Sequence, residues 1–205
     1  GLLYAGTETG LYISFDDGKN WKPFQLNLPV VPVTDLLVKE KDLVVATQGR
    51  AFWILDDLTP LYQLSGKISD AKAHLFDPRD TYRLPGGGGR GGPSPNSGAN
   101  PPNGVMTFFT LSEELGEDGE FTLEYLESDG DVIKTFTNKK DKKSSEPTAE
   151  TKKGMNRFVW NMRYPDAKKV PGAVMWGGTH IGPKAVPGEY QVRMTVNGKS
   201  QTQSF

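Results

Sequence analysis

The residues with the clearest potential for chemistry lie in one polar turn near the start of the chain, "SFDDGKNW" at residues 14–21. Asp16 and Asp17 could act as an acid–base pair of a glycosidase or as oxygen ligands of a metal. A glycosidase needs two carboxyl groups that face each other at about 5–10 Å. Neighbours on an extended chain point to opposite faces instead, and the same holds for Asp56 and Asp57. The sequence therefore predicts no catalytic residue here and favours a structural turn.

The turn has the pattern Ser-x-Asp-x-Gly-x-x-Trp, set by Ser14, Asp16, Gly18 and Trp21. Asp16 can accept hydrogen bonds from backbone N–H groups, Gly18 can adopt a positive φ, and Trp21 can pack beneath the turn. The pattern resembles the Asp-box of sialidases, sortilins and related β-propellers, with Asn20 in place of the usual threonine. In that family the box lies on the outer rim, away from the central ligand site. The resemblance thus implies a structural role for these four residues.

Two further turns hold candidates for a ligand or interface site. Gln48 and Arg50 flank a glycine, and Arg50 could bind an anionic ligand or pair with an aspartate at position 56 or 57. Trp176 and His180 lie in a glycine-rich stretch at residues 175–183. An exposed tryptophan could stack on a sugar, dock a partner chain in an assembly, or pack on the rest of the protein.

Several classes of function are excluded or disfavoured by composition. The chain has no cysteine and two histidines, which rules out disulfides, thiolate metal sites and a multi-histidine zinc site. No phosphate-loop or Gly-x-Ser-x-Gly motif occurs. We therefore expect no metal and no cofactor. A net charge of −1 argues against nucleic acid as a partner, and no apolar run approaches the ~20 residues of a membrane span.

The segments that position these candidates are short. They alternate between apolar and polar residues, and turn residues separate them, as expected for β-strands. An apolar strand, a turn with glycine and an aromatic strand occur around residue 5 and again around residue 46, at the spacing of about 40–45 residues typical of propeller blades. The predicted strands cover residues 2–5, 11–14, 21–25, 35–39, 43–47, 52–55, 105–111, 120–127, 131–137, 157–164, 189–196 and 200–205.

The predicted organisation is a terminal propeller-blade region with its connection at residues 1–82, a Gly/Pro-rich linker at 83–104, and a domain at 105–205. Residues 59–82 are expected to connect the parts and to pack on the first. Six or seven strands over about 100 residues are typical of an immunoglobulin-like β-sandwich. Its expected core consists of Phe121, Leu123, Tyr125, Phe158, Trp160, Tyr190, Val192 and Met194.

The resemblance extends along most of the chain. "DLVVATQGRAFWILDDLTPL" resembles the last blade of bacterial sortilin-like propeller proteins, with Gln48 where histidine is common. "NRFVWNMRYPDA" and "MWGGTHIGPKAVPGEYQVRM" resemble the sandwich that follows that propeller. The implied fold is all-β: the last one to two blades of a partial propeller, with one Asp-box, and a C-terminal immunoglobulin-like β-sandwich.

This resemblance implies a C-terminal fragment of an exported protein, whose remaining blades come from the same parent chain or from another chain. The expected role is non-catalytic, in binding a peptide or glycan or as a scaffold. The alternative is a supporting part of a glycoside hydrolase whose catalytic residues lie upstream. The chain alone is not expected to be an enzyme, and whether the parent protein is one stays open.

Overall fold

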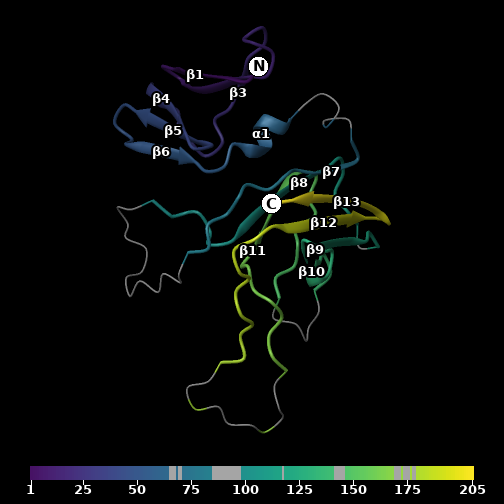
Figure 1. Cartoon of the computed structure of the whole chain (residues 1–205). Helices are drawn as coiled ribbons and strands as arrows, with labels where there is room; N and C mark the ends of the chain where they lie inside the picture. The colour runs from purple at the N-terminus through teal and green to yellow at the C-terminus, as the bar shows by residue number, and fades with distance from the viewer. Residues whose placement is uncertain are drawn as a thin grey trace. The chain divides into compact units, whose positions relative to one another are not determined.

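The computed structural model of the chain is almost entirely β, with 43% of residues in strands and 3% in helix, as expected for an all-β protein. It describes residues 1–64, 68, 71–84, 98–116, 118–140, 146–168, 172, 176 and 179–205. The strands form several small antiparallel sheets and no closed barrel in the described part (Figure 1). The chain divides into two compact units, unit 1 (Gly1–Leu64) and unit 2 (Ser65–Phe205).

Unit 1 contains two three-stranded antiparallel sheets and one short helix. The first sheet is β1 (Leu3–Thr7), β2 (Gly10–Ser14) and β3 (Lys22–Pro23). Strand β3 is shorter than predicted, and Pro23 has no N–H to extend the ladder. The second sheet is β4 (Val33–Lys39), β5 (Asp42–Thr47) and β6 (Phe52–Leu55), followed by α1 (Thr59–Gln63).

The sheet β4–β5–β6 has apolar side chains on both faces. Leu43 and Val45 of β5 point into the core of unit 1, which also includes Leu11, Leu28 and Leu58. On the opposite face Val44 lies across from Leu37 and Ile54, and Ala46 lies across from Phe52. Phe52 is 75% exposed, and Leu37 and Ile54 are also exposed. These strands therefore lack the alternation of apolar and polar side chains that is usual for a sheet with one solvated face.

Unit 2 is built from two antiparallel sheets with the strand orders β10–β9–β12–β13 and β11–β8–β7. The first comprises β9 (Phe121–Glu127), β10 (Val132–Thr137), β12 (Tyr190–Val196) and β13 (Lys199–Ser204). The second comprises β7 (Ala73–Leu75), β8 (Val105–Leu111) and β11 (Gly154–Trp160). Strand β11 starts and ends earlier than the predicted 157–164. It cannot continue to residue 164, because Met162 has a φ of 56°, outside the range of a strand.

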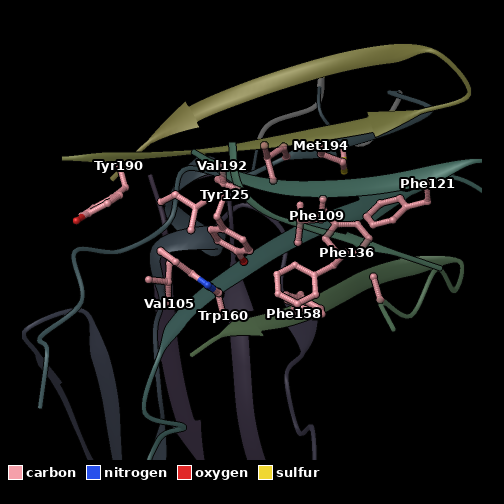
Figure 2. Close-up of a cluster of buried hydrophobic side chains, with 14 of the residues drawn as sticks. Val105, Phe109, Phe121, Tyr125, Phe136, Phe158, Trp160, Tyr190, Val192 and Met194 are labelled. Carbon is pink, nitrogen blue, oxygen red and sulfur yellow. The ribbon is translucent and has the colours of Figure 1, made fainter. Parts of the chain in front are cut away.

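Both sheets of unit 2 contribute to one hydrophobic core (Figure 2). Strand β8 alternates strictly between buried and partly exposed side chains, and its buried face meets that of β9. The ring of Tyr125 stacks on Trp160 with centroids 4.6 Å apart, and its hydroxyl bonds that of Thr107 at 2.8 Å. All eight residues predicted for this core are buried, so this prediction is confirmed.

Strand β7 was not predicted, and it lies in the stretch expected to be a connection. It pairs with β8, while the side chains of Gln201 and Gln203 on β13 bond its other edge. Residues 65–82 therefore belong to unit 2, and the division of the chain after Leu64 does not coincide with the predicted boundary at residue 82. Most of the predicted linker, residues 85–97, lies outside the described residues.

Candidate functional site

The polar turn between β2 and β3 is held together by its own side chains. The hydroxyl of Ser14 donates to Asp16 Oδ1 at 2.9 Å and accepts the N–H of Gly18 at 2.9 Å. Asp16 also accepts the backbone N–H of Asn20 at 2.8 Å and its side-chain amide at 2.6 Å. Asp17 and Gly18 have φ values of 59° and 82°. Both Asp16 oxygens are thus engaged within the turn.

These hydrogen bonds favour the ionised form of Asp16. The side-chain amide of Asn20, followed by its backbone N–H, lowers the pKa of Asp16 to about 2. A carboxyl group with so low a pKa is a poor general acid at neutral pH. Trp21 lies beside the turn: a Cβ added at Gly18 would stand 3.6 Å from the Trp21 ring. Ser14, Asp16 and Gly18 therefore form a hydrogen-bonded corner with Trp21 beside it, and the geometry gives no reason to assign these residues catalysis.

Gln48 and Arg50 lie at the β5–β6 turn with exposed side chains. The turn is closed by Thr47, whose hydroxyl donates to Ala51 O at 2.7 Å, and by the Trp53 indole, which donates to Arg50 O at 2.9 Å. Arg50 makes no ion pair with another described residue, so the expected pairing with position 56 or 57 is not found. At position 57 the side chain is buried, and its Oδ1 accepts the N–H of Thr59.

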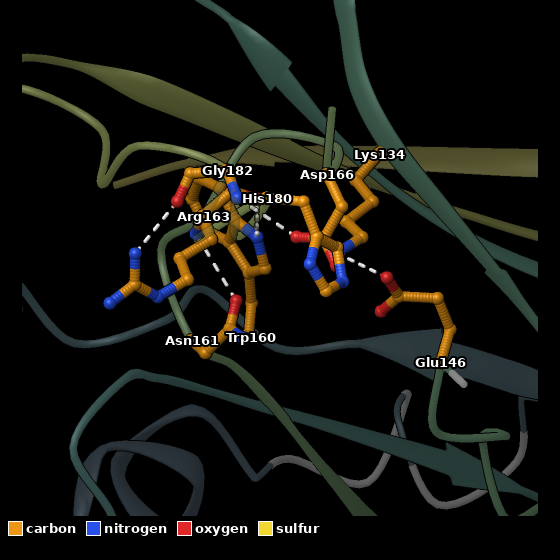
Figure 3. A network of polar contacts seen from close by, with 8 residues as sticks. All are labelled: Lys134, Glu146, Trp160, Asn161, Arg163, Asp166, His180 and Gly182. Atoms are coloured by element: carbon orange, nitrogen blue, oxygen red, sulfur yellow. Dashed lines mark hydrogen bonds and ion pairs between the residues drawn. The ribbon is translucent and has the colours of Figure 1, made fainter. Parts of the chain in front are cut away.

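Trp176 and His180 belong to the segment between β11 and β12. Trp176 is 93% exposed. His180 Nε2 lies 3.9 Å from Asp166 Oδ2, while Asp166 Oδ1 accepts the N–H of Gly182 at 2.8 Å (Figure 3). The carbonyl of Gly182 accepts from Arg163 Nη1 at 2.7 Å. These contacts join residues 163–167 to 180–184, and they place His180 beside Asp166.

Gly182 is required for this arrangement. A Cβ at this position would lie 2.0 Å from the carbonyl oxygen of Tyr164, a backbone atom that cannot move aside freely. The two segments are further joined by Tyr164 N–H to Pro183 O and Ala167 N–H to His180 O. Figure 3 also shows a separate ion pair, in which Lys134 Nζ lies 2.6 Å from Glu146. Lys134 is 8% exposed, so this pair stabilises the edge of unit 2 at β10.

A cavity lies in unit 2, and none of the predicted site residues is among the described residues that line it. Its volume of about 480 Å³ is in the range of small-ligand pockets, about 300–1,000 Å³. Its floor is apolar and aromatic, whereas its rim includes three charged side chains and the 83% exposed Tyr82. Most of the floor residues are buried, and the rim residues are exposed. The floor is lined by Val105, Trp160, Met162, Ala185, Tyr190 and Phe205, and the rim includes Asp80, Tyr82, Arg83 and Glu189.

The hydroxyl of Tyr190 is already bonded: it donates to Val186 O at 2.7 Å. Burial, followed by the charge of Glu127, raises the pKa of Tyr190, while Arg83 acts in the opposite direction. Tyr164 donates a hydrogen bond to Glu127, and this bond raises the pKa of Tyr164 to about 12. Both phenols therefore stay protonated at neutral pH. Arg83 and Glu127 both lie near enough to Tyr190 for their charges to change the pKa of its hydroxyl.

The described residues hold no cluster of three or more His, Cys, Asp or Glu that could bind a metal ion. Among the same residues no helix has the length and apolar character to cross a membrane. No protein-family model, curated protein or solved structure matches the chain. What the site can do therefore follows from its own geometry.

Sequence reasoning missed the cavity for a physical reason. Its residues come from five separate stretches between residues 80 and 205, and none of these stretches has a motif. Two short runs of the sequence carry a weak signal. Tyr82 and Arg83 place an aromatic residue beside a charged one where the predicted connection ends, and "AVPGEY" places two turn residues before a charged and an aromatic residue. Such short polar–aromatic runs become informative only when the fold places them together.

Proposed function

We propose that this chain is a non-catalytic binding segment, with a peptide or a glycan as ligand. The observation that carries the proposal is the cavity of unit 2, which combines an apolar, aromatic floor with a rim of charged and aromatic side chains. Recognition pockets for small ligands and side chains have this composition. No histidine, serine or cysteine is among the described residues that line the cavity, so the usual nucleophile–base pairs are not found there and binding is the function we propose.

The Asp-box geometry supports the further proposal that unit 1 is part of a β-propeller. The hydrogen bonds of Ser14 and Asp16 are those expected for a rigid corner between strands. The exposed apolar face formed by Leu37, Phe52 and Ile54 is consistent with a neighbouring blade as its partner, because large apolar side chains at such density mark a contact surface. The immunoglobulin-like topology of unit 2 and export of the protein belong to the same proposal.

Binding can be tested with the whole chain. Glycan arrays and peptide libraries would be applied to labelled protein, and hits would be checked by NMR of the methionine methyl groups. All five methionines lie in unit 2, and Met162 lines the cavity. We expect ligands to shift the Met162 methyl signal and to leave that of Met194, in the closed core, unchanged.

Two results would contradict this proposal. Absence of any ligand from both libraries would leave the cavity without a binding role. Hydrolysis of a glycoside by the chain itself would make it an enzyme. Glycosidase activity that appears only in a longer form of the protein, and that is lost on changing carboxylates outside this chain, would assign the chain the supporting role instead.

A further inference from the structure

The aromatic side chains at the floor of the unit 2 cavity have no free hydrogen-bond donor. The indole N–H of Trp160 donates to Arg163 O at 3.2 Å, and the hydroxyl of Tyr190 donates to Val186 O at 2.7 Å. Val105, Met162 and Ala185 supply only apolar atoms from their side chains. A sugar hydroxyl in this floor would find no side-chain donor, and the Tyr190 oxygen would be its one side-chain acceptor among these residues, so most of its hydrogen bonds to water would be lost at a cost in free energy. An apolar side chain has no such cost and gains from burial.

The rim carries an excess of negative charge. Asp80 and Glu189 line the cavity mouth with exposed carboxylates, and Arg83 is the cation among the lining residues. Among the described lining residues two carboxylates stand against one guanidinium, so the mouth favours a cation outside the apolar floor.

From these two observations we infer that the cavity binds an extended peptide, whose apolar side chain enters the floor and whose neighbouring lysine or arginine lies against Asp80 and Glu189. This inference rests on the proposed binding function and chooses the peptide over the glycan. Tyr82 and Val186, both exposed at the rim, provide apolar surface on which the rest of the peptide can lie.

The test uses the whole chain with methyl-labelled methionine and four capped hexapeptides, acetyl-Gly-Ser-X-Lys-Ser-Gly-amide, where X is Phe, Leu, Trp or Val. Matched peptides replace Lys by Glu or X by Ala. We expect at least one Lys peptide to shift the Met162 methyl signal in a saturable way. Replacement of Lys by Glu should weaken binding about two- to five-fold, and 0.5 M salt should shrink the difference.

Gly188 provides a variant that closes the cavity with little strain. A Cβ at this position would meet only the Tyr190 ring, at 3.9 Å, which is an ordinary contact. Gly188→Leu should place its side chain at the mouth and weaken the peptide at least about ten-fold, about 1.4 kcal/mol. The matched control is Gly116→Leu, which lies in the same unit where a Cβ meets nothing within 4 Å. The control should bind as the unchanged chain does.

The outcomes separate the two proposals. A Met162 shift with glycans, but with none of the Lys peptides, would overturn the peptide inference and keep the binding function. A Glu peptide that binds as tightly as its Lys partner would overturn the charge assignment. Binding that survives in Gly188→Leu would place the peptide elsewhere. Failure of every peptide and every glycan to bind would overturn both proposals.

Discussion

Tyr125 and Thr107 form a polar pair inside the core of unit 2, and separating them should reveal how much the pair contributes. Both residues have no exposed surface, and their hydroxyl oxygens lie 2.8 Å apart. In Tyr125→Phe the hydroxyl of Thr107 stays buried without this partner. A buried hydroxyl that loses its partner costs about 1–3 kcal/mol, so we expect the free energy of unfolding to fall by that amount.

The complementary change, Thr107→Val, keeps the shape of the side chain and leaves the phenol of Tyr125 unpaired. It should cost about 1–3 kcal/mol for the same reason. The double variant removes both polar groups and should cost less than either single change, about 0–1 kcal/mol. The two changes are therefore expected to be strongly non-additive, as for residues in direct contact.

Urea unfolding followed by the methyl signal of Met194 measures these values for unit 2 alone, since every methionine lies in that unit. The interaction energy comes from the four variants of the cycle. A double variant whose loss equals the sum of the two single losses would refute the reasoning, because the two hydroxyls would then be satisfied independently of each other.

Three further predictions concern other polar groups. Gln201→Leu removes the side-chain bonds to Leu75 N–H and Ala73 O and should destabilise unit 2 by about 1–2 kcal/mol, with faster hydrogen exchange at the Leu75 amide. Burial lowers the pKa of His74 in the folded state, so the unfolded state binds the proton more readily. The stability of unit 2 should therefore decrease as the pH falls below about 6.5, and His74→Phe should remove this part of the slope. Asn20→Ala should raise the pKa of Asp16 from about 2, as measured by NMR titration of its carboxyl carbon.

Each of these has a control or a contrary outcome. Thr202→Val changes an exposed side chain of the same strand, β13, and should leave the exchange of the Leu75 amide as it is. A pH slope of the same size in His74→Phe would show that another group titrates. An unchanged pKa of Asp16 in Asn20→Ala would mean that the Asn20 side chain is not the main cause of the low value.

Local patterns in the sequence were sufficient for most of the strands. The Asn197–Gly198 pair between two predicted strands is a hairpin signal, and both residues have positive φ values, 46° and 78°, in the turn that joins β12 to β13. The strand predicted at residues 105–111 is found with the same bounds as β8, and its side chains alternate between buried and partly exposed because those of a strand point in turn to either side. The turn from Ser14 to Trp21 was equally readable, since all of its side-chain bonds lie within four residues.

Features that depend on distant residues could not be found in this way. Strand β7 has three residues, too few for a pattern, and its edges are set by β8 and by glutamine side chains of β13. The cavity likewise joins stretches that are far apart in the sequence. The prominence of Trp176 in the sequence did not lead to the cavity, which it does not line.

The glutamine bonds between β13 and β7 also have a consequence for the order of folding. Gln201 and Ala73 are 128 residues apart in the chain, so the edge of β7 is completed by a segment that is synthesised much later than β7 itself. Contacts between such distant segments close large loops and slow the folding of a domain. During translation β7 must therefore wait, with its outer edge unprotected, until β13 has left the ribosome. During this interval the unpaired backbone groups on that edge are open to pairing with any other extended segment.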